Sequence, residues 1–285
     1  MMNHANLPMT ETPSPCGIVT LTTDFGAGDW YAGALKGVLL SINPQCFPVD
    51  LTHAIAPQDV QAGSLYLAQA CPCFPAGTVH VAVIDPGVGS SRRPILVVTG
   101  KHCFIGPDNG LFTGVMQAAS SFACIELTNT AYFLESVSST FHGRDIFAPA
   151  AAHITRGIAP LAMGRLIDDP VMLDIAVPAA GPDGSLTGTI VHIDHFGNLI
   201  TDIAAGSIAG MAQGGIEISC SGTIIRKLCS SYAQACAGEL VGILGSSGTL
   251  EISAINASAR LALKARRGQT VTVRPHTGPS RAESP

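Results

Sequence analysis

The first 175 residues alternate short β-branched runs with stretches of helical periodicity. Strands are predicted at residues 18–22, 78–84 and 95–99, because these runs are short and mostly apolar. Helices are predicted at residues 29–42, where apolar side chains recur on one side, and at the Ala-rich residues 146–154. Strands that alternate with helices indicate a mainly parallel sheet flanked by helices, so this half of the chain is predicted to be an α/β domain.

The pattern changes after residues 177–184, a segment rich in Pro, Gly and Ala that is typical of a domain boundary. Beyond it, strands are predicted at residues 186–194, 216–220, 240–244 and 270–274 with little helix between them. Such a pattern indicates a small all-β, barrel-like domain. The predicted organisation is a disordered tail (1–16), an α/β domain (17–176), a linker (177–186), a barrel-like domain (187–275) and a second tail (276–285).

Composition narrows the class of protein. Of the 285 residues, 47% are hydrophobic and 12% are charged, whereas globular proteins average about 25% charged residues. A chain this apolar is not intrinsically disordered, and no apolar stretch reaches the roughly 18 residues of a membrane-spanning helix. The net charge of −5 and the absence of Lys/Arg clusters argue against nucleic-acid binding. The low charged fraction is also what an oligomer with extra buried surface would show.

The N-terminal segment and the cysteines bear on the compartment. The first 15 residues lack the basic and apolar regions of a signal peptide, so secretion is not predicted. Nine cysteines are an odd number, and we expect reduced thiols in a cytoplasmic protein. Cys71 and Cys73 are separated by one residue, which fits neither a CxxC redox motif nor ordinary zinc spacing. No metal site is predicted.

Polar side chains follow two predicted strands, where open α/β sheets bind ligands. Asp24, in the run Thr-Thr-Asp-Phe-Gly, either accepts hydrogen bonds from a ribose diol or serves as a turn residue before the next helix. Asp85 and Arg92 lie in the run Asp-Pro-Gly-Val-Gly-Ser-Ser-Arg-Arg, whose glycines let the loop fold back on itself. The positive charge of Arg92 would favour the ionised carboxylate. This pair belongs either to a site or to a structural salt bridge.

Other motifs place polar groups at turns or at a helix start. His142 precedes the Ala-rich helix, where it serves as an acid, a base or an orienting donor, or only as a structural histidine. Gly-Pro-Asp-Asn-Gly, at residues 106–110, predicts a turn and nothing more. Residues 194–198 and 245–251 supply short polar side chains at strand ends, and both also fit plain hairpin turns.

Six motifs, taken in order, resemble a single family. They are Thr-Thr-Asp-Phe-Gly, Asp-Pro-Gly-Val-Gly with Arg92, Gly-Pro-Asp-Asn-Gly, Phe-His-Gly-Arg-Asp-Ile-Phe-Ala-Pro, Asp-His-Phe-Gly-Asn-Leu-Ile-Thr and Ser-Ser-Gly-Thr-Leu-Glu. The chain resembles the S-adenosylmethionine (SAM) hydroxide adenosyltransferases, or SAM hydrolases, which are relatives of the SAM-dependent fluorinase and chlorinase. The resemblance covers residues 17–275 and implies hydrolysis of SAM to adenosine and L-methionine by attack of water on C5′.

The resemblance also implies the catalytic residues. Family members use an Asp-Arg-His trio, which matches Asp85, Arg92 and His142 here. Asp85 is expected to polarise the water, Arg92 to fix Asp85, and His142 to be a second partner of the water. The sulfonium is already a good leaving group, so neither a metal nor a cofactor is required. Orientation of the water, together with electrostatics, is expected to supply most of the rate enhancement.

Substrate binding and assembly follow from the same resemblance. Asp24 is expected to take the ribose hydroxyls and Asn198 the adenine, while Asp194 and Ser246 match positions that contact the amino acid. The fluorinase has an Arg next to that Ser, where this chain has Ser247, so carboxylate binding would rely on hydroxyl or backbone donors. Family members are trimers with the site between subunits, which implies a homotrimer here.

Two alternatives remain beside the hydrolase. A non-catalytic SAM or adenosine sensor would keep Asp24, Asp194 and Asn198 but would not need the catalytic trio. A halogenase is disfavoured because a carboxylate at Asp85 would repel a halide by about 1–4 kcal/mol at 4 Å. A metal-dependent hydrolase is disfavoured because the histidines are scattered, with no HxH or HExxH motif.

Overall fold

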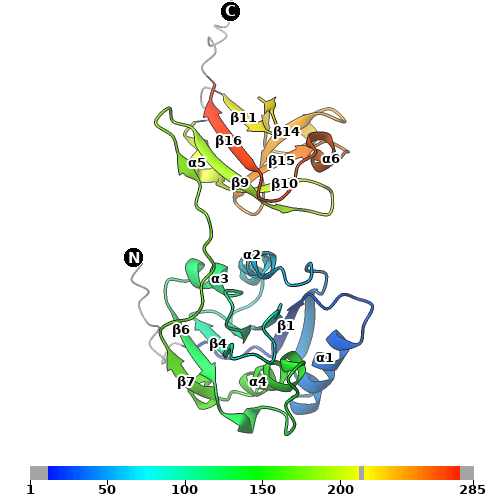
Figure 1. The fold of residues 1–285 in the computed structure, drawn as a ribbon, viewed down its shortest axis with the longest axis vertical. Helices are drawn as coiled ribbons and strands as arrows, with labels where there is room; N and C mark the ends of the chain where they lie inside the picture. The colour runs from blue at the N-terminus through cyan, green and yellow to red at the C-terminus, as the bar shows by residue number, and fades with distance from the viewer. Residues whose placement is uncertain (1–11, 212–214, 277–285) are drawn as a thin grey trace, which may run out of the picture. The chain divides into compact units, whose positions relative to one another are not determined.

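A seven-stranded sheet lies at the centre of the N-terminal unit, which ends at Asp174 in this computed structural model (Figure 1). The structure describes residues 12–211 and 215–276. The strands of this unit are β1 (Ile18–Thr23), β2 (Phe47–Thr52), β3 (Val79–Val83), β4 (Pro94–Thr99), β5 (Cys103–Pro107), β6 (Phe122–Leu127) and β7 (Gly164–Ile167). Its helices are α1 (Tyr31–Ile42), α2 (Val60–Ala70), α3 (Thr113–Ala118) and α4 (Ala148–Thr155), with 3-10 turns at Cys71–Cys73, Thr130–Tyr132 and Pro160–Met163.

The strand order is β2-β1-β3-β5-β4-β6-β7, and the first four strands in this order pair in parallel. β4 is antiparallel to β5 and β6, and β7 is antiparallel to β6, so β4 and β7 run opposite to the rest. β4 reverses because only residues 100–102 join it to β5, and so short a connection joins antiparallel strands. The predicted, mainly parallel α/β sheet is confirmed, with a mixed edge that the alternation of elements did not predict.

Helices cover both faces of this sheet (Figure 1). On one face, Leu35 and Leu39 of α1 share a buried cluster with Val81 of β3 and with side chains of α4. On the other face, Leu67 of α2 shares a cluster with Ala82 of β3 and with side chains of α3. Neighbouring β3 residues reach opposite faces because side chains alternate along a strand. Both faces of the strand are therefore buried, and His80 is the one polar side chain of β3.

The Ala-rich helix predicted at residues 146–154 is α4, and an irregular turn stands where its first residues were predicted. A π-helical turn, Gly143–Phe147, precedes α4. Pro149 has no N–H to donate to the carbonyl of Asp145, and this carbonyl accepts instead from the N–H of Leu134 at 2.9 Å. The turn widens where the regular hydrogen bond is missing. The segment before the turn is thereby tied to the start of α4.

The C-terminal unit begins at Ile175 and is built from short strands. They are β8 (Ala179–Ala180), β9 (Leu186–Ile193), β10 (Leu199–Ala204), β11 (Ile216–Cys220), β12 (Thr223–Ile225), β13 (Leu228–Cys229), β14 (Leu240–Leu244), β15 (Thr249–Ala254) and β16 (Thr270–Pro275). Two short helices, α5 (Ala205–Ala209) and α6 (Ala259–Leu263), and a 3-10 turn at Tyr232–Gln234 connect them.

These strands form one sheet in the order β12-β11-β16-β9-β10-β15-β14-β13, with β8 paired to β9. The sheet curls around an apolar core that includes Ile190, Ile218, Ile252 and Val273, from four different strands (Figure 1). The predicted barrel-like all-β domain is thus confirmed, while the domain boundaries derived from the sequence stay predictions. Among the described residues, no helix has the length and apolar character that crossing a bilayer requires.

Candidate active site

Asp85, Arg92 and His142 form one hydrogen-bonded group. Asp85 follows β3, and the side chain of Arg92 returns to it from seven residues later. Nε of Arg92 lies 2.9 Å and 3.0 Å from the two carboxylate oxygens, and Nη2 also contacts Oδ2. Nη2 donates in addition to Nδ1 of His142 at 2.8 Å. The side chains of Asp85 and Arg92 are only 5% and 9% exposed. The structure therefore brings the three predicted catalytic residues together.

The hydrogen bond from Arg92 defines the protonation of His142. A guanidinium only donates hydrogen bonds, so Nδ1 of His142 must present its lone pair. Burial, reinforced by the charge of Arg92, lowers the pKa of His142, and the opposing effects of Asp85 and Asp145 are smaller. The imidazole is therefore neutral near pH 7 and carries its proton on Nε2. Such a ring can donate one hydrogen bond to a ligand or a water.

The Nη1 amino group of the Arg92 guanidinium has no partner among the described residues. Nη1 is buried, and no residue in the described parts of the chain accepts a hydrogen bond from it. The guanidinium lies over the buried ring of Phe147, with 5.3 Å between Cζ and the ring centroid. An unpaired buried donor costs about 1–3 kcal/mol. A water or ligand oxygen beside Nη1 would remove this cost.

A close backbone approach explains the Gly-rich loop after β3. Gly89 has a φ of +77°, and a Cβ at this position would lie 2.3 Å from the carbonyl oxygen of Ser139. Ser90 closes the loop by donating its hydroxyl to the carbonyl of Gly87 at 2.6 Å. The approach packs this loop against the segment that leads to His142. Only glycine has both the conformation and the space that the position requires.

Asp24 follows β1, the parallel neighbour of β3, so it belongs to the same edge of the sheet as Asp85. Oδ2 of Asp24 accepts from the backbone N–H of Gln58 at 2.8 Å. Gln58 itself has a φ of +66°, an uncommon conformation for a residue other than glycine. The carboxylate is thus oriented by a second loop at this edge, and its role toward a ribose stays a prediction.

Four aromatic side chains that were not predicted as site residues cluster at the same edge. The rings of Phe25 and Phe141 lie 5.9 Å apart, and Tyr31 lies 5.8 Å from the first and 5.4 Å from the second. Trp30 covers the cluster and is 61% exposed. Phe25 directly follows Asp24, and Phe141 directly precedes His142, in two of the six motifs. This adjacency was the sequence signal that could have identified both rings as site residues.

The neighbouring Arg93 has a structural role. Its Nε donates to Asp108 at 2.8 Å, and its Nη1 donates to Asp169 at 2.7 Å. Asp108 is buried and also accepts from the N–H of Val171 at 2.8 Å. The motif Gly-Pro-Asp-Asn-Gly therefore does more than form the predicted turn, because its Asp anchors the last segment of the N-terminal unit. Adjacent arginines thus serve two different carboxylates.

A pocket of about 530 Å³ in the C-terminal unit holds two of the predicted binding residues, Asp194 and Asn198. Oδ1 of Asp194 accepts from the N–H groups of Phe196 at 2.9 Å and Asn198 at 2.8 Å. Oδ2 accepts from the side-chain amide of Asn198 at 2.9 Å. Asp194 therefore orients Asn198, whose remaining amide groups are those available to a ligand.

Ser246 and Ser247 lie in the exposed turn between β14 and β15 and do not line this pocket. Two residues that were not predicted from the sequence connect the turn to the pocket. Tyr232 lines the pocket and donates its hydroxyl to Glu251 at 2.6 Å. Glu251 is buried and its Oε2 lies beside Gly245 of the turn. Glu251 ends the quoted motif Ser-Ser-Gly-Thr-Leu-Glu, but no pattern marks Tyr232.

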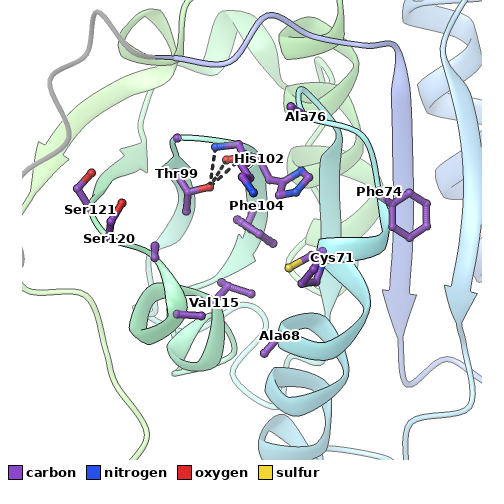
Figure 2. A pocket seen from close by; sticks show the side chains of 15 residues that line it. Ala68, Cys71, Phe74, Ala76, Thr99, His102, Phe104, Val115, Ser120 and Ser121 are labelled. Atoms are coloured by element: carbon purple, nitrogen blue, oxygen red, sulfur yellow. Dashed lines mark hydrogen bonds between the residues drawn. The ribbon is translucent and has the colours of Figure 1, made fainter. Parts of the chain in front are cut away.

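A second cavity, of about 650 Å³, lies in the N-terminal unit and contains none of the predicted site residues. Figure 2 shows Cys71 and Phe104 in its wall and the hydroxyl of Thr99 bonded to the backbone of His102. The ring of His80 lies 5.0 Å from that of His102 and is fully buried. Across the described residues, no group of three or more His, Cys, Asp or Glu side chains could hold a metal ion.

Acid is expected to destabilise the protein through His80. Burial, with a smaller effect of His102, lowers the pKa of His80 to about 3, whereas an unfolded chain has a His pKa of about 6.5. Between these pH values the unfolded chain binds more protons at His80 than the folded chain does. The contribution of His80 to the free energy of unfolding is therefore fully present above pH ~6.5 and is lost as the pH falls toward ~3. Urea unfolding from about pH 7 to about pH 4 measures this slope in the wild type and in His80→Gln.

The exposed His195 provides a matched control for this titration. We expect the slope to decrease in His80→Gln and to stay at the wild-type value in His195→Gln. Carboxylates titrate in the same range, but they contribute equally to all three proteins. Equal slopes in all three proteins would contradict the assignment to His80.

Comparison with known proteins places both units in one class, the SAM hydroxide adenosyltransferases. The family model of the N-terminal domain matches residues 19–164, and that of the C-terminal domain matches residues 188–272. The chain therefore belongs to the SAM hydroxide adenosyltransferase family.

Individual relatives agree with this membership. The chain is 42% identical to the (R)-S-adenosyl-L-methionine hydrolase of Salinispora tropica, over 65% of this chain and 72% of that protein. It is 34% identical to the enzyme of the same name from Thermus thermophilus, over 89% and 98% of the two chains. A fluorinase from Nocardia brasiliensis is 27% identical over 93% and 99%. An uncharacterized conserved protein from Thermotoga maritima has a similar structure, with a TM-score of 0.86, 30% identity and coverage of 90% and 99%.

Proposed function

We propose that this protein hydrolyses S-adenosylmethionine to adenosine and L-methionine. The observation that carries the proposal is the hydrogen-bonded group of Asp85, Arg92 and His142, in which the buried Nη1 amino group of Arg92 has no partner among the described residues. Relatives that are 34–42% identical are named (R)-S-adenosyl-L-methionine hydrolases, which supports the same activity and directs attention to the (R) epimer at sulfur.

The chemistry needs a positioned water and little else. As the water oxygen bonds to C5′, a water proton passes to the carboxylate of Asp85 and later to solvent. The C5′–S bond breaks with both electrons going to sulfur, so the sulfonium leaves as the neutral thioether of methionine. The free Nη1–H of Arg92 and the Nε2–H of His142 are the donors proposed to orient the water oxygen. Orientation of the water and electrostatic stabilisation supply most of the rate enhancement, because a carboxylate alone is a weak base toward water.

Binding is proposed to use side chains of the N-terminal unit of one subunit and of the C-terminal unit of a neighbouring subunit. Asp24 would accept from the ribose hydroxyls, and Asn198, oriented by Asp194, would hydrogen-bond the adenine. Asp194, Ser246 and Ser247 would meet the methionine end. We also propose that the protein needs no cofactor or metal, acts in the cytoplasm, and forms a homotrimer with active sites between subunits.

Incubation of the purified protein with each sulfonium epimer of SAM tests the proposal. EDTA would be present, and parallel reactions would contain chloride or fluoride. Adenosine and methionine in equal amounts, independent of halide, are the expected products in chromatography. SAM or adenosine binding without adenosine formation would favour the sensor. A 5′-halo product would favour the halogenase and overturn the role of Asp85.

A further inference from the structure

His53 follows β2 and lies at the same edge of the sheet as Asp24, which follows β1. The two strands pair in parallel, with Thr52 opposite Thr22, so the segments that follow them begin at one edge. The side chain of His53 is only 12% exposed, and His53 was not among the predicted site residues. A largely buried ring at this edge needs polar partners from the surrounding loops.

Two contacts of His53 hold the residues on either side of Asp24. Nδ1 of His53 lies 2.8 Å from Oγ1 of Thr23, which is fully buried and precedes Asp24. Oγ1 of Thr23 also accepts from the backbone N–H of Phe25 at 3.2 Å. Beyond Asp24, the N–H of Gly26 donates to the carbonyl oxygen of His53 at 2.7 Å. The turn that carries Asp24 is therefore tied to one histidine at both of its ends.

The other ring nitrogen of His53 determines the direction of these hydrogen bonds. Nε2 lies 3.0 Å from Oδ1 of Asp50, close enough for an ion pair but not aligned as a regular hydrogen bond. Oδ2 of Asp50 accepts from Nζ of Lys36 at 2.6 Å. An ionised carboxylate only accepts, so the neutral ring carries its proton on Nε2 and presents the lone pair of Nδ1 to Thr23. The hydroxyl of Thr23 then donates to His53 while it accepts from Phe25.

We infer that His53 is a positioning residue that orients Asp24 toward the ribose hydroxyls of the substrate. Oδ2 of Asp24 is held by the N–H of Gln58 at 2.8 Å. With the flanking backbone held by His53, Oδ1 has a defined direction from which to accept a ribose hydroxyl. Hydrogen bonds weaken steeply when they are misaligned, so loss of His53 would weaken ribose binding. The inference rests on the proposed function and assigns to His53 an effect through Asp24, not a contact with the substrate.

Substitution of His53 tests this inference through kcat and KM for SAM. His53→Ala should raise KM by about threefold to tenfold, the effect of about one hydrogen bond. It should leave kcat nearly unchanged, because the ribose is bound equally in the ground state and the transition state. His53→Asn keeps an acceptor near the position of Nδ1 and should recover most of the loss.

A second histidine of the same unit provides the matched control. His153 is half-buried in α4, and His153→Ala should leave KM unchanged. An unchanged KM in His53→Ala, or a loss of kcat alone, would overturn the inference.

A double-mutant cycle separates positioning of Asp24 from a general structural effect. Asp24→Asn should lower kcat/KM, and His53→Ala added to it should lower kcat/KM by less than about twofold more, because residues that act through one contact are not additive. The same loss from His53→Ala in both backgrounds, or wild-type kcat/KM in Asp24→Asn, would overturn the inference. If His53→Ala does not fold, Thr23→Val replaces it in the cycle, because it removes the hydroxyl and keeps the branched shape.

The failure of the proposed hydrolysis would be distinguishable from the failure of this inference. If the wild type forms no adenosine from SAM, the hydrolysis proposal fails. The Kd of adenosine, measured by calorimetry on the same variants, then tests the role of His53 with the same expected pattern of losses.

Discussion

Replacing Asp85 with Asn is expected to lower kcat by about 10²- to 10⁴-fold, the contribution of a positioned acid or base. The amide keeps the shape of the side chain but removes the charge opposite Arg92 and the acceptor for the water proton. Because the proposed contact of Asp85 is with water and not with the nucleoside, KM for SAM should change little. Steady-state formation of adenosine, followed by chromatography, measures both constants.

Two further variants show whether the loss is specific to Asp85. Asp169→Asn removes an exposed carboxylate that binds the adjacent Arg93, and it should leave kcat unchanged. Asn198→Ala should raise KM before it affects kcat, because Asn198 is proposed to bind the adenine. Normal turnover by Asp85→Asn would show that the trio has been assigned wrongly.

Gly89→Ala is expected to lower kcat by about 10- to 100-fold, although the residue itself carries no reactive group. The new Cβ would meet the carbonyl oxygen of Ser139 at 2.3 Å, so the Asp85 loop and the His142 segment must move apart. A displacement of about 1 Å at a reacting group is enough for such a loss. The left-handed backbone should also cost about 1–2 kcal/mol of unfolding free energy.

Gly157→Ala separates the two effects of that substitution. Gly157 has a φ of +87°, close to that of Gly89, but no atom lies within 4 Å of its added Cβ. It should therefore show a similar loss of unfolding free energy with wild-type kcat. Chemical denaturation and adenosine formation, measured on both variants, make the comparison. Equal kcat values in the two variants would argue against a role of the loop contact.

The contact between Asp85 and Arg92 was predictable because one short loop carries both residues, whereas the grouping of His142 with them followed from the family resemblance. Asp85 and Arg92 lie in one loop whose glycines indicate that it folds back, and the seven-residue separation is enough to return the guanidinium to the carboxylate. His142 could be found because it precedes an Ala-rich helix within a recognisable motif. The ends of β1 and β3 could also be predicted from the sequence, because apolar runs locate both strands. Parallel neighbouring strands then place their carboxyl ends at one edge of the sheet.

Contacts that depend on register or on competing hydrogen bonds could not be predicted in the same way. Tyr232 and Glu251 are separated by 19 residues, and nothing in the hydrophobic pattern shows that they meet. The ion pair of Arg93 with Asp108 depends on β4 running antiparallel to β5, which the alternation of strands and helices does not reveal. The π-helical turn directly precedes Pro149, whose missing N–H leaves the carbonyl of Asp145 to Leu134, and no hydrophobic pattern reveals this.

That missing N–H matters for any attempt to transfer this chemistry to another scaffold. His142 precedes the widened turn, Phe147 ends it, and both contact the guanidinium of Arg92. The guanidinium that Asp85 holds is therefore packed against residues at both ends of a backbone irregularity next to Pro149. A grafted chain that kept Asp85, Arg92 and His142 but restored a regular helix here would hold these side chains at different angles.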